Sequence, residues 1–372
     1  VLGHAGLRSL GQWSYSIYLW HWPLVVALRM TDAFLDQPQL AAFGVAALSV
    51  VCGALSYRWV ESYSQQGWVR LRRPVLAMAA AALLAVGAAV SGGWPGRGEA
   101  GAAYGDYLAS VRAAYYPDRC SNFMKTVQDM QVCSVRKGSS PPRILVIGDS
   151  HAEQLYPWFV AHSGVTVDFY TQAECPPVPN FERVQSGFHC RDYAGAAWGK
   201  AATEPYDTLV LAAYWPNIGL NGAPYCHAER HAPCSLTEGS RKQALVRTEL
   251  KLAIESLLAQ GKTVVMLAPT PASRVRVPER IARERFWFGE VRLQIDARTL
   301  VEQTGWLTPL FEELRGRPGF HLIDLNDQLC TGQVCKVYDS ELKRPVYIDE
   351  SHFDPVWMST HGDALAPFAR AR

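Results

Sequence analysis

Apolar residues are distributed unevenly along the 372-residue chain. They dominate about the first ninety positions, and the remainder has the mixture of an ordinary globular protein. Three apolar segments, residues 13–30, 40–57 and 74–90, approach the roughly 20 residues that a helix needs to cross a bilayer. The first contains His21 and Pro23 among many aromatic residues, so a buried helix of a soluble protein is the alternative there. Three such segments in succession favour three transmembrane helices.

Charge next to these segments predicts their orientation. Residues 58–73, between the second and third segments, contain four arginines, whereas residues 31–39 contain two aspartates and no Lys or Arg. The positive-inside rule places the basic loop in the cytoplasm. Everything after about residue 92 is then expected on the opposite, oxidising side of the membrane.

From residue 143 onward the pattern changes to alternating strands and helices. Apolar runs at 144–147, 165–170, 208–213, 263–268 and 321–325 predict strands. Helices are predicted between them, at 151–162, 241–260 and 293–303. This alternation is typical of a three-layer α/β/α domain with a parallel sheet. Residues 92–105 are rich in Gly and Ala and predict a linker, and the run GSSPP at 138–142 marks a boundary.

The predicted organisation therefore has three parts. Residues 1–93 are membrane segments, residues 94–142 are a linker and an extension, and residues 143–372 are the α/β domain.

Eight of the nine cysteines occur as neighbouring couples in the part expected outside the cytoplasm, and Cys52 lies alone in a predicted span. The couples are Cys120 with Cys133, Cys175 with Cys190, Cys226 with Cys234, and Cys330 with Cys335. Four local disulfides are the simplest interpretation for an exported domain. Metal binding or free thiols are the alternative. No couple has the CxxC spacing of a zinc site, although His227 beside Cys226 is a weak exception, so we expect no metal.

Net charge and motifs exclude other classes of partner. The formal net charge of +2 gives no reason to expect a nucleic acid partner. Residues 148–150 lack the Lys of a phosphate-binding loop, and no dinucleotide fingerprint is present, so no bound cofactor is expected. A basic cluster at residues 274–285 predicts either a solvated face, which we favour, or a patch that binds an anionic glycan.

Candidate chemistry lies at Ser150, where the first strand of the α/β domain turns into a helix. A helix N-terminus offers unpaired N–H donors to an oxyanion. Near the C-terminus, Asp349 precedes His352 by three residues. A nucleophilic serine needs a base, and the base needs an acid that orients it, so Ser150, His352 and Asp349 are predicted as a catalytic triad. His361 competes with His352 for the role of base, and His151 is expected to belong to the start of the helix.

These motifs resemble those of a known superfamily. The run ILVIGDSH at residues 144–151 is similar to the first block of SGNH (GDSL-type) hydrolases, and DESH at 349–352 is similar to their final DxxH block. The resemblance implies oxyanion donors from the Ser150 N–H, a Gly and an Asn. Here TQAE at 171–174 has no Gly, and LAAYWPN at 211–217 leaves Asn217 as the candidate.

The front of the chain carries a second resemblance. LGQWSYSIYLWHWP at residues 10–23 and LSYRWVE at 55–61 resemble late transmembrane segments of the type-three membrane acyltransferases. Together the two resemble bacterial O-acetyltransferases of lipopolysaccharide O-antigen, which fuse such a membrane part to a periplasmic SGNH domain. This implies an inner-membrane protein, a lipid bilayer and a polysaccharide acceptor as partners, and acetyl-CoA as the ultimate donor. Because the chain begins with Val1 rather than Met, we expect an N-terminal portion of the membrane acyltransferase to be missing.

Three functions fit these features. The leading hypothesis is transfer of an acetyl group through Ser150 to a hydroxyl of an extracytoplasmic polysaccharide. The second is a carbohydrate esterase or deacetylase that uses the same triad with water. The third is a glycan-binding module without catalysis, and the presence of all three triad residues argues against it.

Overall fold

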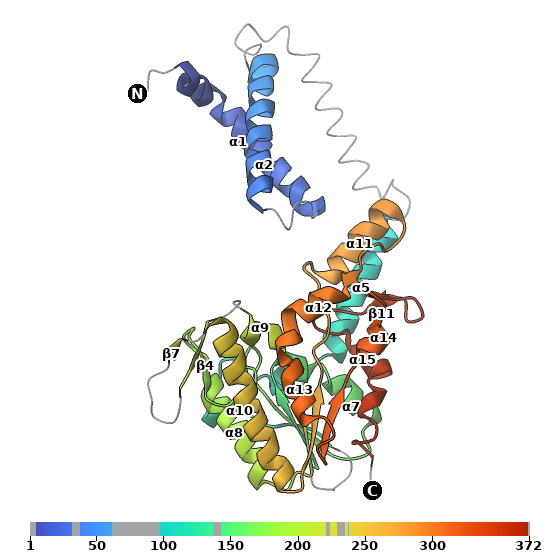
Figure 1. Ribbon diagram of the computed structural model, residues 1–372. Helices are drawn as coiled ribbons and strands as arrows, with labels where there is room; N and C mark the ends of the chain where they lie inside the picture. The colour runs from blue at the N-terminus through green and yellow to red at the C-terminus, as the bar shows by residue number, and fades with distance from the viewer. Residues whose placement is uncertain are drawn as a thin grey trace. The chain divides into compact units, whose positions relative to one another are not determined.

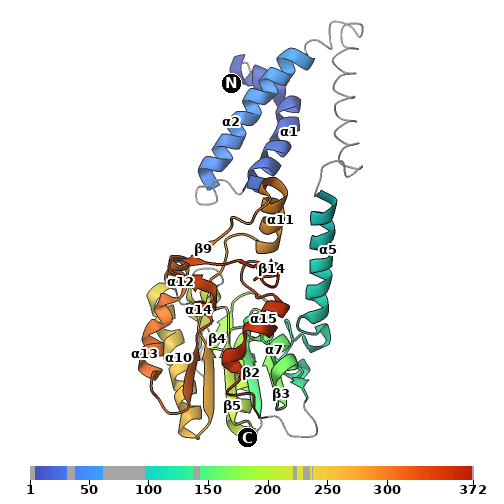
Figure 2. The same ribbon diagram turned by 90° about the vertical axis from the view of Figure 1, so that its right-hand side faces the viewer.

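The computed structural model describes residues 5–31, 38–61, 97–136, 143–220, 224–228, 235–236 and 238–370. They belong to two compact units, Val1–Pro95 and Gly96–Arg372 (Figures 1 and 2). The described part of the first unit is helical, and the second unit is built around a β-sheet.

The described part of the first unit contains two long helices. They are α1 (Ala5–Thr31) and α2 (Pro38–Ser56), and α2 continues into a short π-helix, η1 (Tyr57–Glu61). At Gly53 the two helices approach so closely that an added Cβ would lie 2.5 Å from an atom of Ile17 on α1. The Ser16 hydroxyl donates a hydrogen bond to the Glu61 carboxylate. Close approach at glycine and polar contacts between helices are both typical of helix pairs in membranes.

The prediction of three transmembrane helices is not supported by the described residues. One helical segment there, Gln39–Trp59, is long and apolar enough to cross a membrane, and it matches the predicted span at 40–57. The predicted span at 13–30 lies within α1, but its Ser, Tyr, Trp and His side chains lower its mean hydropathy. The third predicted span, at 74–90, lies outside the described residues.

The second unit is organised around a six-stranded sheet with the order β1-β3-β2-β5-β8-β10. Its strands are β1 (Cys133–Val135), β2 (Ile144–Gly148), β3 (Val167–Thr171), β5 (Thr208–Ala212), β8 (Thr263–Leu267) and β10 (Phe320–Ile323). The five apolar runs predicted from the sequence form the five parallel strands. The sheet is nevertheless mixed, because β1 pairs antiparallel with β3 at one edge. A three-residue strand in the extension gave too short a pattern to predict.

Among the described residues, ten α-helices follow β2 in the chain. They are α6 (Ser150–Glu153), α7 (Tyr156–His162), α8 (Cys190–Thr203), α9 (Trp215–Gly219), α10 (Gly239–Ala259), α11 (Val277–Phe288), α12 (Ala297–Thr304), α13 (Thr308–Leu314), α14 (Asn326–Leu329) and α15 (Pro355–His361). The single helix predicted at 151–162 is two helices, α6 and α7, separated by a turn.

Short strands form three small sheets beside the main one. The first contains β4 (Phe181–Arg183), β6 (Tyr225–His227) and β7 (Ser235–Leu236). The second contains β9 (Ile295–Asp296), β11 (Cys330–Thr331) and β12 (Val334–Cys335). The third is the pair β13 (Tyr338–Asp339) and β14 (Arg344–Pro345).

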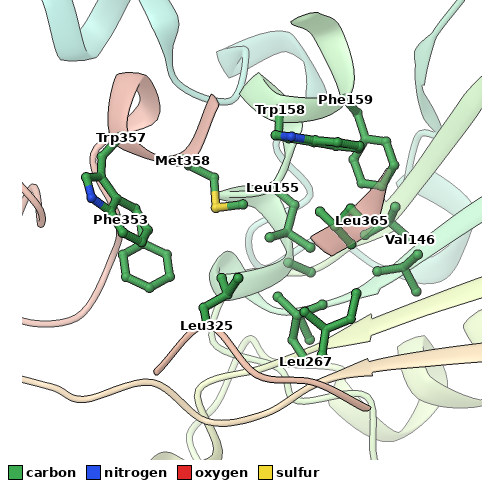
Figure 3. Packing of buried hydrophobic residues seen from close by; sticks show 14 of the residues in the cluster. Val146, Leu155, Trp158, Phe159, Leu267, Leu325, Phe353, Trp357, Met358 and Leu365 are labelled. Carbon is green, nitrogen blue, oxygen red and sulfur yellow. The ribbon is translucent and has the colours of Figure 1, made fainter. Parts of the chain in front are cut away.

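Alternating side chains of the central strand divide the core into two layers. On β2, Ile144 and Val146 belong to one apolar cluster, and Leu145 and Ile147 belong to the other. The first cluster includes residues of α7 and α15, and the second includes residues of α8, α10 and α13. Figure 2 shows α7 and α15 on one side of the sheet and α10 and α13 on the other. Figure 3 shows the first cluster, in which the Trp158 ring of α7 lies near Met358 of α15. Helices on both faces explain why the central strands β2, β5 and β8 are apolar along most of their length.

The extension contains a helix where a linker was predicted. Residues 97–114 form α5 (Arg97–Ala114), so the linker prediction for 92–105 is wrong over its described part. Alanine favours helix, and tertiary contacts compensate for the glycines in this segment. The Tyr107 hydroxyl donates a hydrogen bond of 3.3 Å to the Tyr347 carbonyl, and the Arg344 guanidinium lies over the Tyr107 ring. α5 is therefore attached to the segment that precedes Asp349.

Three of the four predicted disulfides are present. They join Cys120 to Cys133, Cys175 to Cys190, and Cys330 to Cys335. Cys226 is also disulfide-bonded, but its predicted partner, Cys234, lies outside the described residues. Cys52 is free.

A close approach between strands makes Gly148 a sensitive position. Its φ is +151°, and an added Cβ would lie 1.8 Å from the Ala212 carbonyl oxygen on β5. We expect Gly148→Ala to lower the free energy of unfolding by about 2–4 kcal/mol, because backbone atoms must shift. Urea denaturation of the full chain measures this change. Gly199→Ala on α8, where an added Cβ meets nothing within 4 Å, is the control and should stabilise by roughly 0.5–1 kcal/mol. Equal effects of the two substitutions would contradict the proposed collision.

Candidate active site

The Ser150 turn is held by the carboxylate of Asp149, the residue between β2 and α6. The Asp149 side chain is 1% exposed. One of its oxygens accepts a hydrogen bond from the His151 N–H at 2.8 Å and so caps α6. The other accepts a hydrogen bond from the Tyr214 N–H at 2.8 Å. Because Tyr214 follows β5, this carboxylate joins the Ser150 turn to the end of the neighbouring strand.

The structure brings Ser150, His352 and Asp349 together. The Ser150 Oγ lies 2.7 Å from His352 Nε2, and His352 Nδ1 lies 2.7 Å from Asp349 Oδ2. A carboxylate only accepts hydrogen bonds, so the proton on Nδ1 is donated to Asp349. The lone pair of Nε2 then accepts the hydrogen bond from the Ser150 hydroxyl. These three side chains form a continuous hydrogen-bonded chain between motifs 202 positions apart.

Backbone contacts fix the segment that carries Asp349 and His352. The second carboxylate oxygen, Oδ1, accepts hydrogen bonds from the Ser351 and His352 N–H groups, both at 2.8 Å. Gln154 Oε1, one turn after Ser150, accepts a hydrogen bond of 2.7 Å from the Phe353 N–H. The turn at the end of α6, the helix that begins at Ser150, therefore also positions the histidine segment.

The loop after β8 supports this segment from another side. The Val277 N–H donates to the Asp349 carbonyl at 3.2 Å, and the Ser273 N–H donates to the Glu350 carbonyl at 2.7 Å. The basic residues of this loop and of α11 are largely paired locally. Arg276 contacts Glu279, and Arg280 contacts Glu284. This pairing agrees with a solvated face rather than a free cationic patch.

The electrostatic environment shifts the pKa values of the ionisable groups of the site in different directions. Burial opposes ionisation of Asp349, but its hydrogen bond to His352 and the charge of that ring outweigh burial and lower the pKa of Asp349. Burial also opposes protonation of His352, yet the hydrogen bond and charge of Asp349 raise the pKa of His352. Burial lowers the pKa of His151, with a further contribution from His352. Burial raises the pKa of Glu153 to about 7.

His361, the competing candidate, lies in a different environment. Its ring stacks on Trp357, with centroids 4.6 Å apart and planes at 5°. Its Nε2 lies 3.6 Å from the Asp339 carboxylate. These contacts account for His361 as part of the packing of α15.

The predicted oxyanion donors have different surroundings. Ser150 begins α6, so its N–H lies at a helix N-terminus. Asn217 lies on the short helix α9, and its Nδ2 is 3.5 Å from the Glu174 carboxylate. The hydrogen bonds of the described residues do not connect Asn217 to Ser150, and its role stays a prediction.

Residues that the motifs did not reveal also border the site. Tyr214 and Gln154 bond to the two halves of the site, and no local sequence signal distinguishes them. Asp149 did have a signal, because Asp before a helix start is a preferred cap. Within the described residues, no group of three or more His, Cys, Asp or Glu side chains is placed to hold a metal ion.

A three-layer domain with a serine at the end of a central parallel strand, and with histidine and aspartate on a C-terminal turn, defines an SGNH-type domain. The chain belongs to the family described as "SGNH domain (fused to AT3 domains)", whose model matches residues 117–356. No curated protein matches the chain. Among solved structures, it is similar to the periplasmic domain of a lipopolysaccharide acetyltransferase from Salmonella ser. Paratyphi A, at 14% identity and a TM-score of 0.46. That alignment covers 61% of this chain and 84% of the other.

The raised pKa of His352 predicts a pH dependence. With His352 as the candidate base, ester cleavage would require the neutral ring, so the rate should rise with pH through a pKa above the usual 6.5. We expect Asp349→Asn to move this acid limb to lower pH, because burial still lowers the pKa while the raising contribution of Asp349 is lost. The pH profile of kcat for p-nitrophenyl acetate measures the shift.

Glu153 is the control for this profile, because it also titrates near neutral pH. Glu153→Gln keeps an oxygen that can accept the hydrogen bond of the Thr171 hydroxyl. In the Glu153→Gln background, Asp349→Asn should still move the acid limb to lower pH by the same amount. If the acid limb moves in Glu153→Gln and not in Asp349→Asn, the titrating group is Glu153 and the assignment to His352 is wrong.

Proposed function

We propose that the protein transfers an acetyl group to a hydroxyl of an extracytoplasmic polysaccharide through an acyl-enzyme on Ser150. The observation that carries the proposal is the hydrogen-bonded chain from Ser150 through His352 to Asp349, with both distances at 2.7 Å. A serine hydroxyl is a weak nucleophile by itself, and this arrangement supplies the base that activates it.

The first half of the reaction loads the serine. Ser150 Oγ attacks the carbonyl carbon of the acetyl donor while His352 Nε2 takes the hydroxyl proton. The imidazolium of His352 then gives this proton to the leaving group, and the bond between the acetyl carbon and the leaving group breaks. Asp349 holds the tautomer with the proton on Nδ1 and stabilises the imidazolium.

The second half repeats these steps with the acceptor. His352 takes the proton of a sugar hydroxyl, and the sugar oxygen attacks the acetyl carbon on Ser150. The Ser150 oxygen leaves and regains the proton from His352. Water in place of the sugar gives the esterase reaction, so the triad is compatible with both acceptors.

The membrane context favours transfer over hydrolysis. The family description names SGNH domains fused to AT3 domains, and residues 10–23 and 55–61 resemble late membrane segments of such acyltransferases. A hydrolase has no need of a partner that exports acyl groups. In this proposal the N-terminal membrane portion supplies acetyl groups that originate from acetyl-CoA, and the lipid bilayer anchors the chain in the bacterial inner membrane.

The disulfides support a periplasmic location of the SGNH domain, which is the side of the membrane where the proposed acceptor is found. Three local pairs are formed in the SGNH domain, and disulfides persist in oxidising compartments such as the periplasm. An extracytoplasmic glycan such as O-antigen is the acceptor class available there.

Removal of the nucleophile or base should nearly abolish the reaction. For Ser150→Ala and His352→Ala we expect losses in kcat on the order of a thousandfold or more, and Asp349→Asn should lose less than Ser150→Ala. Hydrolysis of p-nitrophenyl acetate by the full chain measures all three variants. His361→Ala is the matched control and should keep the wild-type rate within about threefold, since the His361 ring stacks on Trp357 within α15 and not on Ser150 or His352. Loss of activity in His361→Ala together with full activity in His352→Ala would require a different site.

The acceptor is tested on the surface polysaccharide. Cells that lack the gene for the full-length protein should have polysaccharide without the acetyl group, as measured by mass spectrometry, and wild-type protein should restore it. Ser150→Ala, produced at the same level, should not. An increase in polysaccharide acetylation on deletion would instead identify a deacetylase.

A further inference from the structure

His151, the residue after Ser150, lies against the ring of His352. The His151 side chain is buried, with 6% of its surface exposed. Its ring centroid is 4.2 Å from that of His352, and the planes are tilted by 34°. On its other side, the Tyr214 ring stacks at 4.8 Å with the planes at 19°. His151 therefore occupies the middle of a three-ring stack that ends on His352.

Hydrogen bonding does not account for this placement. Neither ring nitrogen of His151 has a hydrogen-bond partner among the described residues. The Asp149 carboxylate is 3.7 Å from Nδ1, beyond ordinary hydrogen-bond length. What the ring does provide is a flat apolar face directed at His352.

The hydrogen bonds of His352 do not by themselves hold its ring face in place. Its two hydrogen bonds, to Asp349 at Nδ1 and to Ser150 at Nε2, both lie at ring nitrogens. Both hydrogen bonds act in the plane of the ring, so they oppose a tilt of the ring out of this plane only weakly. A contact on the ring face restricts this tilt, and a tilt of the Nε2 lone pair away from Ser150 weakens proton transfer.

We infer that His151 is a positioning residue that fixes the plane of His352 by ring stacking. This inference rests on the proposed function of the triad. The same turn carries Ser150 and His151, so a single backbone unit, capped by Asp149, sets both the nucleophile and the plane of its base.

Charge is consistent with this role. The groups that face the His151 ring are Asp149 on its own turn, His352 and Asp349 on the C-terminal turn, and Tyr214 after β5. Burial and the neighbouring His352 lower the pKa of His151, so the ring is neutral when His352 takes the proton of Ser150. A neutral aromatic face attracts an imidazolium, whereas a second imidazolium would repel it.

The test compares His151→Ala, which removes the stack, with His151→Phe, which keeps a ring but no nitrogen. With p-nitrophenyl acetate and the full chain, we expect His151→Ala to lower kcat about tenfold or more with little change in KM. His151→Phe should recover to within about threefold of wild type. His361→Ala, which removes the other stacked histidine, is the control for general loss of packing.

A spectroscopic measurement separates this inference from the proposed function. In a Ser150→Ala background, the NMR shift of the His352 Hε1 proton reports the neighbouring ring without any catalysis. We expect the shift to change in His151→Ala and to stay close to the parent value in His151→Phe. If Ser150→Ala is as active as wild type, the proposed function fails. If Ser150→Ala is inactive but His151→Ala keeps full activity, or His151→Phe is as weak as His151→Ala, the positioning role alone is overturned.

Discussion

The close contact between β2 and β5 at Gly148 is the constraint on which the site depends. The Gly148 backbone lies against the Ala212 carbonyl, and no side chain fits between the strands there. The Tyr193 hydroxyl adds a second restraint, because it accepts a hydrogen bond from the Gly148 N–H and donates one to the Gly148 carbonyl. The end of β2 is thus held on both sides before the chain turns into Asp149 and Ser150. The position of Ser150 is therefore set by the sheet and not by a surface loop.

From this fixed point, hydrogen bonds extend to the segments that complete the site. Asp149 bonds to the Tyr214 N–H after β5, and Gln154 bonds to the Phe353 N–H after the histidine. The loop after β8 bonds to the carbonyl of Asp349. The ends of three parallel strands, β2, β5 and β8, therefore contribute to one arrangement, as expected for sites beyond the carboxyl ends of strands in α/β sheets. Most of these contacts use backbone N–H groups, so they depend on the fold more than on side-chain identity.

The sequence predicted what depends on local pattern. The parallel strands lie in mainly apolar segments, and all five were predicted within a few residues because burial in the sheet favours such segments. Ser150, Asp349 and His352 were found because short motifs specify their chemistry. The structure brings them together, and their catalytic roles remain part of the proposed function.

Features that depend on tertiary contacts were missed. Glycines and alanines in α5 resemble a linker, and packing rather than propensity determines that helix. β1 is too short to show a period, and it exists because β3 offers an edge to pair with. The predicted spans show the opposite error, since composition overstated how apolar residues 13–30 are. Asn217 was selected by its position in a family motif; its Nδ2 lies 3.5 Å from the Glu174 carboxylate, and its role as an oxyanion donor stays a prediction.

The pKa values of two adjacent imidazoles in the site, His151 and His352, are shifted in opposite directions. The rings of His151 and His352 are 4.2 Å apart, yet Asp349 raises the pKa of one and burial lowers the pKa of the other. When two similar groups lie in contrasting environments, their pKa values differ, and the group with the higher pKa is the one that accepts the proton. In the proposed mechanism, the proton removed from Ser150 therefore stays on His352 and does not pass to the buried ring. Asp349 is also partly exposed, with 26% of its side chain accessible. The buried ring can then restrict the orientation of the base without competing for its proton.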